Sequence, residues 1–109
     1  MHLVAPEYSS YLIPEGTYSG EPPSFCSEHF LKLSAMGWTD LWRHHNPGKT
    51  EWTWYSTRKG GVRGNGFRLD HAFASRSLLP RVTSCRYSHR EREARVSNHS
   101  IVIVEIAAA

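Results

Sequence analysis

The chain has 109 residues, a length that suits one domain and leaves no room for two ordinary ones. Its composition is that of a globular protein, with 39% hydrophobic and 21% charged residues, so a packed core is possible. The net charge of +3 is compatible with an anionic partner and equally with an ordinary mixed-charge surface.

The cysteine content and the hydropathy of the chain indicate its cellular compartment. Cys26 and Cys85 are isolated, without a CxxC motif or histidines at zinc spacing, as is typical of buried thiols in a reducing compartment. No apolar run approaches the roughly 18 residues that a membrane-spanning helix needs, and no basic segment followed by an apolar run opens the chain. We therefore expect a cytoplasmic protein that does not enter a membrane.

The first part of the chain predicts little regular structure and then two short helices. Residues 1–24 contain four of the six prolines, which indicates an irregular N-terminal arm. Residues 24–37 predict an amphipathic helix that begins at Ser24 and stops at Gly37, with Phe30, Leu31 and Leu33 on one side. Residues 38–48 predict a second helical turn, capped by Thr39 and ended by Asn46, Pro47 and Gly48.

From residue 51 the hydrophobic period changes to two, which is typical of strands. Residues 51–57 alternate aromatic and polar side chains. Residues 58–66 hold four of the eight glycines and predict a basic hairpin connection. In the strand expected at 67–75, Phe67, Leu69, His71 and Phe73 share one face, and Arg68, Asp70 and Ala72 the other.

The last third predicts two further strands joined by a charged connector. The strands are expected at 81–89 and 100–106, and the connector at 90–95. The continuous β-branched run of the final strand indicates burial on both faces. The predicted class is therefore α+β, with short helices followed by a mostly antiparallel sheet.

Two polar residues interrupt these apolar strands. Asp70 lies inside "FRLDHAF", and His99 lies at the start of "HSIVIVEI". A carboxylate in a strand costs free energy unless it is paired, and a histidine is a natural partner. An aspartate that accepts a bond from one imidazole nitrogen fixes the tautomer and leaves the other nitrogen for a substrate. Residue types alone leave a structural role for this pair open.

Four motifs in order carry a resemblance to a known family. The strings "GWTDLWRHHNP", "EWTWYS", "GNGFRLDHAFAS" and "SNH" before an apolar strand resemble the C-terminal half of the endonuclease/exonuclease/phosphatase superfamily. The most similar branch is that of exodeoxyribonuclease III and the apurinic endonucleases, with its "GW-D-WR", "TWWS", "RIDY-LAS" and "SDH" motifs. The resemblance covers roughly residues 25–106, so we assign 25–109 to the C-terminal half of such a domain.

The resemblance implies a fold and a set of site residues. Family members are Mg²⁺-dependent phosphodiesterases or phosphatases on a four-layer α/β sandwich, of which this chain would form half. By this resemblance His99 contacts the scissile phosphate, Asp70 orients His99, and Trp54 lies near the substrate groove. We group Arg68 and Asn65 with Trp54 as candidate substrate-binding residues.

The chain also departs from the family pattern. Asn98 stands where the family has an aspartate, and an amide cannot ionise, accept a proton or give a negative charge to a metal. Asn98 is nevertheless grouped with the candidate catalytic residues. The family's metal-binding glutamate and "GDFN" pair lie upstream of the matched motifs, and residues 1–24 contain no similar stretch. Mg²⁺ is thus the expected cofactor, with no metal ligand assigned in this chain.

Two functions remain open at this point. The first is a partial Mg²⁺-dependent nuclease, inactive or weak alone because the metal-binding half is missing. The second is a non-catalytic remnant that binds nucleic acid or a protein. Nucleic acid is the expected partner in the first case. Half a sandwich would also expose an apolar sheet face, which predicts a homodimer, a complementary chain or a marginally stable fragment, unless residues 1–16 fold back as a partial cover.

Overall fold

The computed structural model describes residues 28–57 and 59–108. The predicted arm at residues 1–24, the N-cap at Ser24 and Cys26 lie outside them. The described elements follow in chain order: α3 (Glu28–Ala35), β1 (Thr39–Asp40), α4 (Leu41–His45), β2 (Trp54–Thr57), η1 (Lys59–Gly61), β3 (Arg63–Phe67), β4 (Phe73–Ala74), η2 (Leu79–Arg81), β5 (Val82–Ser88), α5 (Arg90–Glu93) and β6 (Ile101–Ile106). Within these ranges no helix has the length and hydropathy needed to cross a membrane.

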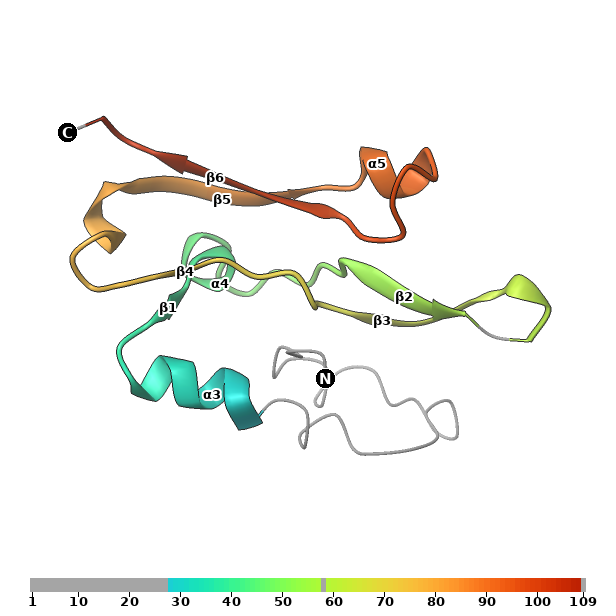
Figure 1. The fold of residues 1–109 in the computed structure, drawn as a ribbon, viewed down its shortest axis with the longest axis horizontal. Coiled ribbons are helices and arrows are strands. Elements are labelled where there is room, and N and C mark those ends of the chain that lie inside the picture. Colours follow the sequence, from blue (N-terminus) through green and yellow to red (C-terminus); the bar gives the residue numbers. More distant parts are fainter. Residues whose placement is uncertain (1–27, 58, 109) are drawn as a thin grey trace.

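The strands form three antiparallel pairs, β1 with β4, β2 with β3, and β5 with β6. Figure 1 shows the long β5–β6 pair with α5 at its turn, and the β2–β3 pair as a hairpin that extends away from α4. The predicted α+β class, with short helices and antiparallel strands, is confirmed.

Helix α3 ends where the sequence predicts. Trp38 donates its backbone N–H to Leu33, and Gly37 donates to Ser34, the bond pair of a Schellman motif. Gly37 has φ +94, which a glycine adopts without steric cost. Phe30 is buried as expected, but Leu31 is 55% exposed because it lies about 100° around the helix from Phe30. The expectation that Leu31 shares the packed side is wrong.

The start of α4 also differs from the prediction. Thr39 pairs with Ala74 in the β1–β4 ladder, and the N-cap is Asp40, whose carboxylate accepts the N–H of Arg43. The predicted end at Asn46 is confirmed, because Asn46 caps the helix. Its side-chain amide donates to the carbonyls of Trp42 and Cys85 and so ties α4 to β5.

The core lies between α4 and the β5–β6 pair. Six buried hydrophobic residues form it: Leu41, Trp42, Ala74, Val82, Cys85 and Tyr87. From β6, Val102 and Val104 pack against this cluster, whereas Ile101 and Ile106 are exposed. Burial of the last strand on both faces was therefore a wrong expectation. On the outer face the partners of β6 are polar, with Ser88 opposite Ile101 and Arg86 opposite Ile103.

Residues 67–75 do not form one continuous strand. β3 ends at Phe67, and only Phe73 and Ala74 form β4. Arg68 is 1% exposed, while Leu69 on the opposite predicted face is only partly buried. The single strand expected at 67–75 is thus wrong, and Arg68 is buried because its guanidinium pairs with Asp40 inside the fold.

Candidate functional site

The structure brings Asp70 and His99 together, although they are 29 residues apart in sequence. His99 Nδ1 lies 2.8 Å from Asp70 Oδ2 and 3.1 Å from Oδ1. An ionised carboxylate only accepts hydrogen bonds, so the proton lies on Nδ1 and Nε2 is the nitrogen that can face a ligand. The two side chains are 34% and 28% exposed, which leaves the pair accessible to a substrate.

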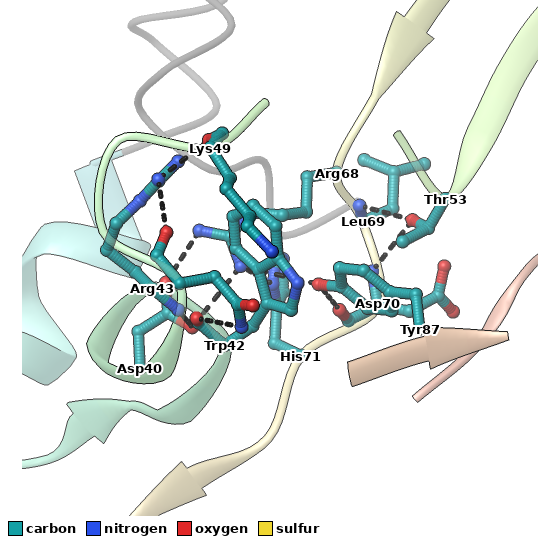
Figure 2. Close-up of polar contacts among 11 residues, drawn as sticks. Asp40, Trp42, Arg43, Lys49, Thr53, Arg68, Leu69, Asp70, His71 and Tyr87 are labelled. Atoms are coloured by element: carbon teal, nitrogen blue, oxygen red, sulfur yellow. Dashed lines mark hydrogen bonds and ion pairs between the residues drawn. The ribbon is translucent and has the colours of Figure 1, made fainter. Parts of the chain in front are cut away.

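Thr53 positions both sides of this pair. The residue is completely buried, and its hydroxyl accepts the backbone N–H groups of Leu69 at 2.9 Å and Asp70 at 3.3 Å. Its carbonyl accepts the N–H of Ser100 at 2.8 Å, next to His99. Figure 2 shows the Thr53 hydroxyl pointing at the bend that carries Leu69 and Asp70. One threonine therefore fixes the backbone on both sides of the site.

Tyr87 holds Asp70 from the other side. Its phenol donates to the backbone carbonyl of Asp70 at 2.6 Å. Burial raises the pKa of Tyr87 well above its ordinary value, so the phenol stays protonated and remains a donor at neutral pH. The N–H and the carbonyl of Asp70 are thus both engaged by buried side chains, and its carboxylate is left to His99.

Arg68 lies in the interior rather than at the substrate face. Its two terminal nitrogens bind the carboxylate of Asp40 at 2.6 and 3.2 Å, a bidentate pair, and its guanidinium lies 4.8 Å from the ring centroid of Trp42. Figure 2 shows Arg68 directed toward Asp40 and Trp42, away from the Asp70 carboxylate. In this geometry Arg68 supports the core, because a guanidinium that is 1% exposed and paired with Asp40 is not open to a substrate.

Trp54 and Asn65 lie on the β2–β3 hairpin. The Trp54 ring centroid is 6.4 Å from that of His99 and 5.6 Å from that of Phe67. Trp54 therefore forms an aromatic wall beside the imidazole. Asn65 receives a hydrogen bond from Ser56 at its carbonyl and donates its N–H to the same hydroxyl. These backbone contacts place Asn65 on the hairpin ladder.

A second polar cluster supports the strand entry at Ser100. The Ser100 hydroxyl is buried and is bound by His89 Nδ1 and by Arg92 at 2.8 Å. His89 Nε2 in turn binds Glu51, and Arg92 also donates to the carbonyl of Trp52 at 3.0 Å. Because Ser100 is 2% exposed, this arrangement braces the segment that carries His99 and does not present a nucleophile.

Asn98 lies beside the pair, in the wall of an adjacent pocket. Mg²⁺ prefers several oxygen ligands, usually carboxylates. In residues 28–57 and 59–108 no three His, Cys, Asp or Glu side chains gather in a way that could hold a metal ion. Asp70 is bound by His99, and Asn98 offers only a neutral amide. These residues do not fit a Mg²⁺ site.

Sequence reasoning identified Asp70, His99 and Trp54 but missed Thr53 and Tyr87. The available signal for Thr53 was a lone polar residue between Trp52 and Trp54. Neither residue touches the imidazole, so motif chemistry did not point to them. No family model, no curated protein and no solved structure matches this chain. The family resemblance therefore stays a prediction.

Proposed function

We propose that this chain is part of a Mg²⁺-dependent phosphodiesterase that acts on nucleic acid, with His99 as the residue that contacts the phosphate. The observation that carries the proposal is the bond between His99 Nδ1 and the Asp70 carboxylate at 2.8 Å, at the entry of β6 and beside Trp54. The four motifs that resemble exodeoxyribonuclease III support the substrate class.

The geometry suggests how the pair would act on a phosphodiester. Asp70 holds the imidazole in one tautomer and orientation, so Nε2 is directed to the ligand. When His99 is protonated, Nε2–H donates to a phosphate oxygen, and Asp70 stabilises the imidazolium. A preorganised donor of this kind stabilises the charge that develops on the phosphate in the transition state. Trp54 offers a flat apolar surface for the adjoining sugar or base.

Mg²⁺ belongs to this proposal as the family's cofactor, and its ligands would come from outside the described residues. Because the described side chains do not hold it, we expect the chain alone to cleave slowly. A cytoplasmic location belongs to the same proposal and is supported by Cys85, a free and buried thiol whose pKa burial raises to about 11.

The test is cleavage of a fluorescent abasic-site DNA duplex by the full chain in Mg²⁺. We expect slow cleavage that EDTA stops and that His99→Ala abolishes. A control variant, Arg86→Gln, changes an exposed arginine on β5 and should cleave like the parent. Cleavage that survives His99→Ala would contradict the proposal.

The alternative is a non-catalytic remnant of the same fold that binds nucleic acid. Asn98 favours it, because the neutral amide lacks the charge and the proton affinity of the family's aspartate. A folded sample that binds the duplex and never cuts it would support this alternative.

Asn98→Asp separates the two functions further. The substitution restores a group that can bind a metal or a proton beside His99. If the chain is a weak enzyme, we expect Mg²⁺-dependent cleavage to rise about tenfold or more, since general acid–base groups contribute roughly 10²–10⁴-fold in rate. An unchanged rate in the presence of Mg²⁺ would favour the remnant.

A further inference from the structure

A second site adjoins the Asp70–His99 pair and is lined by residues other than His99 and Trp54. Trp54 and Tyr55 are successive residues of β2, so their side chains leave the strand on opposite faces. Around Tyr55 lies a pocket of about 310 Å³. The residues that line it are Tyr55, Ser56, Thr57, Gly61, Arg63, Arg92, Arg95, Ser97 and Asn98.

The described part of the pocket wall carries charge of one sign. Among residues 28–57 and 59–108, three arginines line the pocket and no aspartate or glutamate does. The acidic residues of α5 are directed elsewhere, since Glu91 accepts a hydrogen bond from Ser88, and Glu93 is exposed outside the pocket wall. The remaining polar lining consists of hydroxyls and the Asn98 amide, which are neutral. A wall of this composition attracts an anion.

The guanidinium groups of Arg63 and Arg92 lie against the ring of Tyr55. Arg63 Cζ lies 4.1 Å and Arg92 Cζ 4.9 Å from the ring centroid of Tyr55. Stacking orients a guanidinium while leaving the edge with its N–H donors open to a partner. Because two guanidinium groups lie at the Tyr55 ring, N–H donors are the main groups that this part of the wall offers, and they favour a phosphate over a base.

Arg92 is also fixed by hydrogen bonds. It donates to the carbonyl of Trp52 and to the hydroxyl of Ser100. Its Nε–H is buried and has no hydrogen-bond partner in the part of the chain that the structure describes. Arg92 is therefore held in a set position at the pocket wall, which is the property of a preorganised anion ligand.

Arg95 has a backbone conformation that is unfavourable for an arginine. It has φ +60, a left-handed conformation that disfavours residues with a Cβ. At the equivalent position after α3 the chain has Gly37. An arginine where a glycine fits better, with its side chain in the wall of a basic pocket, indicates that the guanidinium itself is needed there.

From these observations we infer that Arg63, Arg92 and Arg95 form a phosphate-binding pocket around Tyr55, separate from His99. The pocket is larger than a free phosphate ion requires. Its ligand in this inference is a phosphate group that belongs to a larger molecule, namely a phosphate of a nucleic-acid backbone. This inference does not depend on cleavage at His99, since the described lining of the pocket does not include His99.

The experiment is calorimetric titration of the full chain at low salt with two probes, inorganic phosphate and a six-nucleotide single-stranded DNA. We expect both to bind, the oligonucleotide at least about tenfold tighter and with a stronger salt dependence because it releases more counterions. Equal affinity for the two probes would contradict the assignment to a backbone, and no binding of either would overturn the pocket.

Single substitutions test which residues bind the phosphate. Arg95→Gly removes one guanidinium and relieves the backbone, so we expect about a fivefold weaker affinity for phosphate with an unchanged or higher Tm. Arg63→Gln should weaken binding by a similar factor. Arg86→Gln removes the same charge outside the pocket and should bind as the parent does. The titration measures phosphate binding and not cleavage, so a failure of this pocket can be told apart from a failure of the proposed cleavage at His99. An equal loss in Arg86→Gln would mean that only overall charge matters, and the inference would fail.

Discussion

Asp70 is held at every polar group it has. Thr53 accepts its N–H, Tyr87 donates to its carbonyl, and His99 binds its carboxylate. The sequence allowed the Asp70–His99 pair to be predicted because the two residues interrupt apolar segments and need a partner. It did not point to Thr53 or Tyr87, because both act on backbone groups, and a backbone contact leaves no pattern in residue types.

Replacing Thr53 with Val tests this residue-scale account. The change keeps the volume but removes the hydroxyl, so the N–H groups of Leu69 and Asp70 lose their acceptor inside the protein. We expect a loss of about 1–3 kcal/mol in the free energy of unfolding, measured by urea denaturation. Thr53→Ser keeps the hydroxyl and should lose less. Equal stability of the two variants would show that the hydroxyl does not support the bend.

The position of Arg68 could not be predicted from its local sequence. An arginine in an alternating strand predicts a solvent-facing side chain, and a phosphate contact follows easily from that. Its actual partner is Asp40, 28 residues earlier, in a segment expected to be a helical turn. A tertiary ion pair of this kind depends on how β1 and α4 meet the end of β3, and that arrangement is not encoded in local pattern.

At the scale of elements, α3 and α5 end by the same motif with different residues. After α5, Val96 donates to Glu91 and Arg95 donates to Arg92, the bond pair seen after α3 at Gly37. The glycine made the end of α3 predictable. The segment 90–95 contains no glycine, so the sequence indicated only a charged connector and gave no sign of α5.

This comparison predicts opposite effects of two substitutions on stability. Arg95→Gly should raise the free energy of unfolding by about 1 kcal/mol, because a glycine takes the left-handed conformation without strain. Gly37→Arg should lower it by a similar amount. Thermal denaturation of both variants checks the pair. A loss of stability in Arg95→Gly would show that contacts of the arginine side chain outweigh the backbone strain.

At the scale of the whole molecule, two buried titratable groups of the core make the folded state less stable at alkaline pH. Burial, with the neighbouring Asp40, raises the pKa of Cys85 from 9.0 to about 11, and burial raises that of Tyr87 above 10.0. Both groups bind their protons more tightly folded than unfolded. Their contribution is therefore complete below pH 9 and is lost as pH rises through the folded-state values.

The pH dependence can be measured by urea denaturation between pH 8 and 11. We expect Cys85 to account for about 2 kcal/mol of the loss across this range. Cys85→Ala lacks this group, so its stability should fall less steeply with pH, even though its stability at pH 8 is lower. Parallel pH curves for the parent chain and the variant would contradict the assignment to Cys85.

The predicted partner chain stays a prediction. Half of a sandwich was expected to expose an apolar sheet face, and the outer side of β5–β6 instead alternates Ile101 and Ile103 with Arg86 and Glu105. Antiparallel pairing and helix ends follow from local sequence, whereas the separation into three strand pairs depends on contacts between distant segments. The fold class could therefore be predicted from local sequence, whereas the arrangement of the strand pairs and the partner of the chain could not.

The most direct test of the central claim is the binding of an abasic-site oligonucleotide, followed by fluorescence anisotropy in EDTA so that nothing is cut. We expect His99→Ala and Asp70→Asn each to weaken binding about tenfold relative to the parent chain, because the phosphate loses an oriented donor. Parent and variants that bind with the same affinity would show that His99 does not contact the phosphate.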